Sequence, residues 1–132
     1  TVDGKVTNLR YAYAKEQKDT FDDTKTVILV IFSDKRLSKE ALGNWGTRTG
    51  MARKGQVVCF EVTIDEDANI KQYYLRYREP VGNPSGNTYQ LVYEQETFDQ
   101  NTISGKVRLK EPMELFGAKI ELSVKFNASI MK

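Results

Sequence analysis

The clearest pattern in the chain is an alternation of apolar and polar side chains over residues 119–130. The apolar positions are Ile120, Leu122, Val124, Phe126, Ala128 and Ile130. Successive side chains of an extended chain point to opposite faces, so this segment has one apolar face and one polar face. The pattern predicts an antiparallel strand that lies on a core and exposes its other face to water.

Further segments alternate in the same way, and we expect each to form a strand: residues 5–14, 56–64, 70–79 and 103–109. We expect residues 89–98 to form another strand. The link 65–69 is rich in aspartate and asparagine, which favours Asx turns, so the strands on either side of it should form a hairpin. Residues 26–32, TVILVIF, are apolar on both faces and rich in β-branched side chains. This run predicts a strand at the centre of the sheet that is covered on both sides.

Three segments interrupt the strand pattern. Residues 15–25 are polar and predict a loop, and residues 111–118 are expected to cross over to the last strand. Within residues 33–55, Ser38 can cap a short helix that begins at Lys39. Glycines follow closely after it, and each glycine inside a helix lowers helix stability by about 1 kcal/mol relative to alanine. We therefore expect one or two helical turns and then an irregular connection.

These elements predict an all-β fold, a single antiparallel β-sandwich or flattened barrel of about seven strands with one short helix. We expect residues 1–132 to form one β domain, since this length suits a single domain. A closed barrel with an internal ligand pocket is the alternative. Strands and helices do not alternate along the chain, which argues against an α/β fold.

The composition removes several kinds of chemistry. The chain has no histidine, which excludes Ser-His-Asp and Cys-His catalysis and any metal site that uses histidine. Its one cysteine, Cys59, cannot form an intrachain disulfide, and we expect it to be a packed side chain because no basic residue is near it in sequence. No motif indicates a catalytic residue, a metal ligand or a cofactor.

Charge and hydropathy bear on possible partners. Twenty Lys and Arg residues nearly balance eighteen Asp and Glu residues, and this net charge of +2 does not indicate nucleic-acid binding. No apolar run approaches the roughly 20 residues of a transmembrane helix, so we expect no transmembrane segment. A protein or a glycan is the expected partner, and the oligomeric state is left open.

Tyrosine and arginine mark the one candidate interaction surface. On the strand 70–79, Tyr74, Arg76 and Arg78 share the face opposite Tyr73. Tyr and Arg are enriched at binding hot spots, although cross-strand packing on a wet sheet face is an alternative role. Trp45, the only tryptophan, either closes one end of the core or is an exposed binding platform.

Carboxylates offer a third possibility. A pair of acids can hydrolyse a glycosidic bond without histidine if the two face each other across a cleft. The sequence places several acids on expected strands but pairs none of them: Glu61, Glu94, Glu96 and Glu121.

Three segments resemble small bacterial exported or lipoprotein-like β domains of unknown role. GKVTNLRYAYA (residues 4–14) and VILVIFSDKRLSKEAL (27–42) are similar to the opening of such domains, and TFDQNTISGKVRLKEPMELFGAKIELSVKFNA (97–128) is similar to their closing strands. The resemblance implies a compact β-sandwich that is exported to the periplasm or the cell surface, and it assigns no residue a role.

We therefore expect a non-catalytic binding or accessory domain of an exported bacterial protein. The alternatives are a barrel-type carrier of a small apolar ligand and a histidine-free hydrolase that uses carboxylates.

Overall fold

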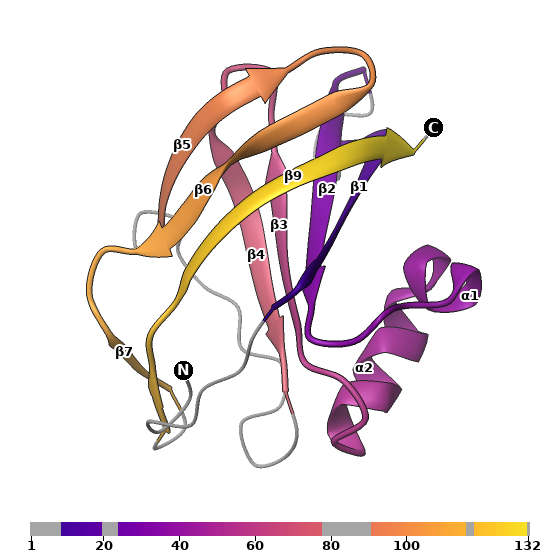
Figure 1. Ribbon diagram of the computed structural model, residues 1–132, viewed down its shortest axis with the longest axis vertical. Coiled ribbons are helices and arrows are strands. Elements are labelled where there is room, and N and C mark those ends of the chain that lie inside the picture. Colours follow the sequence, from indigo (N-terminus) through magenta and orange to yellow (C-terminus); the bar gives the residue numbers. More distant parts are fainter. Residues whose placement is uncertain (1–8, 20–23, 78–90, 116–117, 132) are drawn as a thin grey trace.

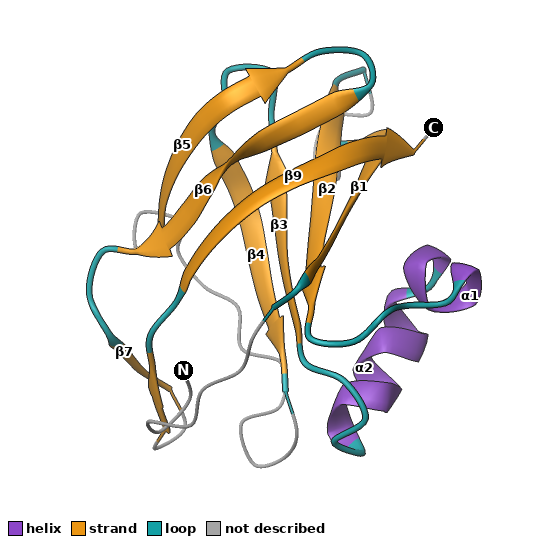
Figure 2. Ribbon diagram, viewed as in Figure 1, coloured by secondary structure: helices purple, strands orange, loops and turns teal. Residues whose placement is uncertain are grey.

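The computed structural model describes residues 9–19, 24–77, 91–115 and 118–131 of the chain. The elements in these ranges are β1 (Tyr11–Lys18), β2 (Thr26–Ser33), α1 (Lys39–Gly43), α2 (Trp45–Arg53), β3 (Cys59–Ile64), β4 (Ile70–Arg76), β5 (Leu91–Phe98), β6 (Thr102–Leu109), β7 (Met113–Leu115), β8 (Ala118–Ile120) and β9 (Ser123–Met131). Figure 2 shows that strands dominate and that both helices lie together beside the sheet. The mostly β fold predicted from the sequence is confirmed.

The main sheet has seven strands in the order β4-β3-β2-β1-β9-β6-β5. Neighbouring strands are antiparallel except β1 and β9, which run parallel with Ala14 opposite Ile130 and Lys15 opposite Met131. The expectation of a purely antiparallel sheet is wrong at this pair. A parallel pair needs a long connection, and here nearly all of the described chain lies between the two strands.

The sheet curls into a half-barrel, so that β9, β6 and β5 pass across the inner face of the other four strands (Figure 1). The rings of Phe32 on β2 and Phe126 on β9 lie 5.1 Å apart, centroid to centroid, although β1 separates these strands in the sheet. Further ring contacts join Tyr73 to Phe60, Phe60 to Phe32, and Phe126 to Tyr93. This aromatic series connects β4, β3, β2, β9 and β5 through the inner core.

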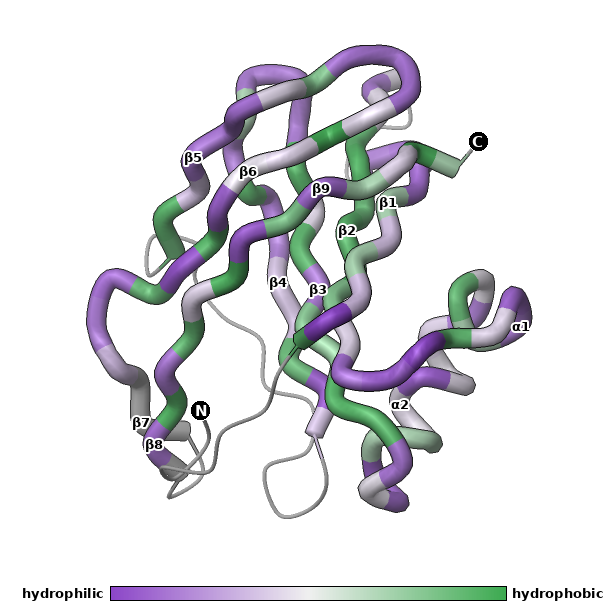
Figure 3. Tube along the Cα trace, viewed as in Figure 1, coloured by the Kyte–Doolittle hydropathy of each residue, from purple (hydrophilic) through white to green (hydrophobic). Residues whose placement is uncertain are grey.

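The alternation near the end of the chain is confirmed. Val124, Phe126 and Ala128 are buried in the inner core, whereas Lys125 and Asn127 are exposed. Figure 3 shows this as alternating hydrophobic and hydrophilic positions along β9. The predicted continuous strand is interrupted after Ile120, since its first residues belong to β8, which pairs in a separate two-stranded sheet with β7 of the expected crossover.

The strand 26–32 lies inside the sheet, as its apolar sequence predicts. β2 pairs with β1 on one side and β3 on the other. Val30 and Phe32 point into the inner core, and Ile31 points into a second apolar cluster under the helices. The predicted hairpin is also present as β3 and β4, and the Asp65 carboxylate accepts hydrogen bonds from the backbone N–H groups of Asp67 and Asn69 at its turn.

The predicted loop over residues 15–25 is wrong at its start, because β1 continues to Lys18. Residues 15–18 pair with residues 26–29 of β2, and this pairing satisfies backbone hydrogen bonds whatever the side chains are. The polar side chains of Lys15 and Gln17 are compatible with this strand because they point to the outer face of the sheet and not into the inner core. Residues 5–8 of the predicted first strand lie outside the described residues.

Two short helices cover part of the outer face (Figure 1). Ser38 caps α1 as predicted, with its hydroxyl accepting from the Ala41 N–H at 3.1 Å. The irregular connection expected next is instead α2, whose cap Asn44 accepts from the N–H groups of Gly46 and Thr47. This cap and the burial of Arg48, Thr49 and Ala52 offset the helix-weakening glycines.

The inner face also explains why residue 105 is glycine. Gly105 lies opposite Gln95, beside a register shift in β5. A Cβ added there would lie 2.8 Å from Cε1 of Tyr93 and would overlap the carbonyl oxygen of Glu94. We predict that Gly105→Ala lowers the free energy of unfolding by about 1–3 kcal/mol, measured by urea unfolding followed by circular dichroism.

Gly50→Ala is the matched control. Apart from its chain neighbours and the backbone of its own helix, no atom lies within 4 Å of a Cβ added to Gly50, which is inside α2. Alanine is more favourable than glycine in a helix interior, so this variant should raise the free energy of unfolding by about 0.5–1 kcal/mol. Equal stabilities of the two variants would show that the contact between β5 and β6 is not tight at Gly105.

Candidate functional site

The outer face of the sheet carries rows of side chains that run across the strands. One row consists of Tyr13, Ile31, Glu61 and Tyr74, and the next consists of Lys15, Leu29, Thr63 and Gln72. Ile31 packs under the helices together with Leu37, Ala41 and Ala52. The helical layer therefore ends near this first row.

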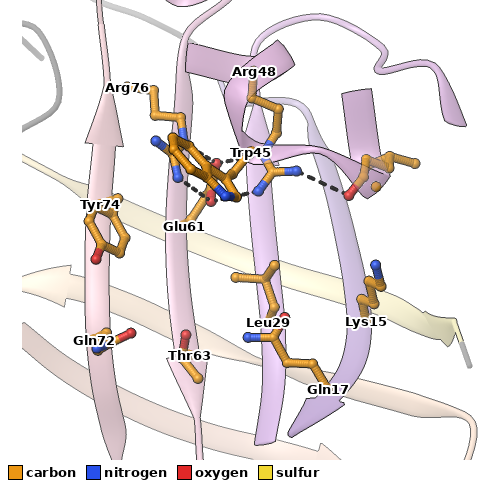
Figure 4. A pocket seen from close by; sticks show the side chains of 12 residues that line it. Lys15, Gln17, Leu29, Trp45, Arg48, Glu61, Thr63, Gln72, Tyr74 and Arg76 are labelled. Carbon is orange, nitrogen blue, oxygen red and sulfur yellow. Dashed lines mark hydrogen bonds and ion pairs between the residues drawn. The ribbon is translucent and has the colours of Figure 1, made fainter. Parts of the chain in front are cut away.

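A pocket of about 560 Å³ lies where the helices stop covering the outer face. Its lining is Lys15, Gln17, Leu29, Leu42, Gly43, Trp45, Arg48, Glu61, Thr63, Gln72, Tyr74 and Arg76. Figure 4 shows Lys15 and Gln17 of β1 at one side of the pocket, and Gln72 and Tyr74 of β4 at the other. We call this space the outer pocket.

Three buried charged side chains form one end of the outer pocket. The Glu61 carboxylate accepts two hydrogen bonds from Arg48, Nε to Oε2 at 2.7 Å and Nη2 to Oε1 at 3.0 Å. It accepts two more from Arg76, Nε to Oε2 at 2.7 Å and Nη2 to Oε1 at 3.2 Å. Arg48, Glu61 and Arg76 are only 3%, 2% and 6% exposed, and we call this group the Arg-Glu-Arg triad.

The triad also joins the helices to the sheet. Nη1 of Arg48 donates to the carbonyl oxygens of Ala41 at 2.8 Å and Leu42 at 3.0 Å, near the end of α1. Nη1 of Arg76 donates to Oγ1 of Thr49 on α2 at 2.7 Å. Bidentate geometry and these further acceptors offset the cost of burying the charges.

Glu61 is ionised in this setting. Burial raises the pKa of Glu61, but hydrogen bonds and charge from Arg48 and Arg76 outweigh burial and hold its pKa below the ordinary value of 4.5. Both of its oxygens are occupied by guanidinium groups, so it is not placed to transfer a proton to a ligand. With two arginines for one carboxylate, the triad carries a net positive charge.

Trp45 and Tyr74 form the aromatic part of the outer pocket. Trp45 is the first residue of α2 and is 68% exposed, so the prediction that it closes the core is wrong. The helix begins there because Asn44 caps it, and the exposed indole lines the outer pocket. Tyr74 is 38% exposed, and the Arg76 guanidinium carbon lies 5.2 Å from the centroid of its ring.

The structure brings together three of the four residues of the predicted surface. Trp45, Tyr74 and Arg76 line the outer pocket, and Arg78 lies outside the described residues. Arg76 was expected on an exposed face, but it is buried because its guanidinium binds Glu61 and Thr49.

Several lining residues had no signal of their own in the sequence, among them Lys15, Gln17, Arg48, Thr63 and Gln72. Glu61 did have a signal, because it is an acid between Phe60 and Val62 in an apolar strand. A charge at such a position needs a partner, yet the sequence did not indicate Arg48, thirteen residues earlier.

The other chemical candidates are placed less favourably. Cys59 is fully buried, as predicted for a packed side chain, and burial followed by the nearby Glu61 carboxylate raises the pKa of its thiol to about 12. Glu94 and Glu96 lie exposed on β5, outside the lining of the outer pocket. Across the described ranges, no group of three or more acidic or cysteine side chains could hold a metal ion.

The triad predicts a large effect of Glu61→Gln. This variant keeps the shape of the side chain but leaves two buried guanidinium groups without their carboxylate. We therefore expect the free energy of unfolding to fall by about 3–5 kcal/mol at about pH 7. Urea unfolding measures it. Glu94→Gln, which neutralises an exposed acid on β5, is the control and should change stability little.

The effect should depend on pH with a defined sign. Because the pKa of Glu61 is lowered on folding, its charge stabilises the fold above the ordinary value of 4.5, and this contribution disappears as pH falls through the lowered pKa. The stability difference between wild type and Glu61→Gln should therefore shrink in acid. A difference that stays constant from about pH 7 to about pH 3 would contradict the ionised triad.

No protein-family model, no curated protein and no solved structure matches the chain. In the part of the chain that the structure describes, neither helix has the length and apolar character that crossing a membrane requires.

Proposed function

We propose that this protein is a non-catalytic binding domain that receives its ligand in the outer pocket. The observation that carries this proposal is the position of Trp45, a large side chain that is 68% exposed at a concave site. A ligand that covered the indole would remove apolar area from water, and aromatic rings are frequent anchors in binding sites. The volume of about 560 Å³ is within the range of small-molecule sites.

The proposal of a non-catalytic role is supported by the chemistry of the lining. Glu61, the one acid among the described lining residues, is occupied by two arginines. A hydrolase of the carboxylate type needs a second acid facing the first across the ligand. The nearby thiol of Cys59 is buried and its raised pKa makes it a poor nucleophile.

The carrier alternative receives less support. A barrel-type carrier needs space for an apolar ligand inside the curled sheet. Much of the inner face is instead occupied by packed side chains, including the aromatic series from Tyr73 to Tyr93. A hollow of about 470 Å³ does include Ile28 and Ile64 of the inner face, but four acids also line it, which does not favour an apolar ligand.

We also propose that the domain belongs to an exported bacterial protein, in which it serves as a binding or accessory module. This part of the proposal rests on the resemblance of residues 4–14, 27–42 and 97–128 to exported β domains. The domain itself would then be a compact sandwich or flattened barrel, of which the curled sheet is the main part.

Trp45 offers a direct test because it is the only tryptophan. Its indole N–H gives one resonance in a ¹⁵N-correlated NMR spectrum, and this resonance reports on the outer pocket. We predict that a panel of monosaccharides, amino acids and nucleotides contains compounds that shift this signal saturably. Tyr74→Ala should weaken their binding by roughly five- to tenfold, since an aromatic contact contributes about 1 kcal/mol.

Phe98→Ala is the matched control. Phe98 is 38% exposed, like Tyr74, but it lies outside the lining of the outer pocket. This variant should bind as the wild type does. If no compound shifts the indole signal, or if both variants lose affinity equally, the outer pocket is not the binding site.

A further inference from the structure

The outer pocket and a second hollow of the molecule differ in the charge of the residues that line them. The described charged residues that line the outer pocket are three cations and one carboxylate: Lys15, Arg48, Arg76 and Glu61. The second hollow, of about 470 Å³, has apolar side chains such as Ile28, Ile64 and Ile130 in its lining, and its described charged residues are all acids: Glu16, Asp65, Glu66 and Asp99. An anionic ligand would therefore be attracted to the outer pocket and repelled from the second hollow.

The two buried arginines have N–H groups that could donate hydrogen bonds to such a ligand. A guanidinium has five N–H donors. The contacts to Glu61 and Thr49 leave one N–H on each of Nη1 and Nη2 of Arg76 without an acceptor among the described residues. Arg48 likewise retains one N–H on Nη2, and both arginines line the outer pocket.

The triad also holds these donors in place before any ligand arrives. Both arginines are more than nine-tenths buried, and each is fixed by two bonds to Glu61. A ligand then binds groups that have already lost their conformational freedom, which favours affinity. Lys15, at the side of the pocket on β1, adds a mobile positive charge.

The remaining lining indicates what carries the anionic group. Gln17, Thr63 and Gln72 supply amide and hydroxyl groups that can both donate and accept hydrogen bonds. Such groups match the several hydroxyls of a sugar. Trp45 and Tyr74 provide flat surfaces against which the apolar face of a sugar ring can pack.

From these observations we infer that the outer pocket binds an acidic sugar, with its anionic group at the N–H donors of Arg76 and Arg48 that are unpaired among the described residues and its ring against Trp45. Lys15 adds positive charge from the β1 side (Figure 4). This inference rests on the proposed function and specifies its ligand class. Carboxylate and phosphate share the chemistry that the arginines recognise, so the anionic group can be either. A nucleotide, which also pairs a ring with an anion and whose base edge can hydrogen-bond to Gln17 or Gln72, is the competing ligand that the test distinguishes.

The test titrates wild-type protein with four probes and follows the Trp45 indole resonance. The probes are glucuronate, glucose 6-phosphate, glucose and adenosine monophosphate. We expect the two acidic sugars to bind at least tenfold more tightly than glucose, because a hydrogen bond to a charged group contributes about 1.5–3 kcal/mol. Their affinity should fall as salt is added.

Lys15→Met tests the charge without disturbing the buried triad. It should weaken binding of glucuronate by roughly three- to tenfold more than it weakens binding of glucose, since only the acidic sugar loses the attraction of this positive charge. Lys106→Met removes the same charge from an exposed position on β6, outside the pocket, and should bind as the wild type does. Equal losses in both variants would show that overall charge, and not the pocket, sets the affinity.

The outcomes distinguish this inference from the proposed function. Equal binding of glucose and glucuronate would overturn the inference and leave a binding pocket for neutral sugars. Tighter binding of adenosine monophosphate than of either acidic sugar would replace the sugar by a nucleotide. A signal that no compound of any class shifts would overturn both.

Discussion

The carboxylate of Glu61 lies between the guanidinium groups of Arg48 and Arg76, and this arrangement organises the outer half of the molecule. Arg48 comes from α2, Glu61 from β3 and Arg76 from β4, while Arg48 also reaches the carbonyl groups of α1. An unpaired charge is very costly in a buried site, so both arginines depend on the Glu61 carboxylate that they share. The triad thereby ties both helices to the sheet, together with the apolar cluster around Ile31.

The same arrangement produces the outer pocket. The helices are short and cover the rows of the sheet that hold Cys59 and Ile31, but they leave the row of Lys15, Thr63 and Gln72 open. At the boundary where the helices end, this step from the covered to the uncovered part of the sheet forms a concave surface. The buried positive charge and the exposed Trp45 meet at this step, and this coincidence is what the proposed binding role rests on.

The two faces of the sheet are stabilised by different kinds of interaction. The inner face is held by apolar burial and by ring contacts such as that of Phe32 with Phe126, which depend on the curl that brings distant strands together. The outer face combines a small apolar cluster around Ile31 with ionic hydrogen bonds. Mutations on the inner face should therefore act on stability, whereas the open row of the outer face can vary without loss of the core.

The sequence by itself determined which side chains of each strand share a face, since that follows from the two-residue period of an extended chain. It placed Phe126 inward and Lys125 outward, it located the Ser38 cap and the Asp65 turn, and it put Tyr74 and Arg76 on one side of a strand. Only the tertiary structure decided that β1 and β9 pair in parallel, that α2 forms despite its glycines, and that Arg48 reaches Glu61. These outcomes depend on which strands become neighbours and how the sheet curls, and contacts between residues distant in sequence leave no local pattern.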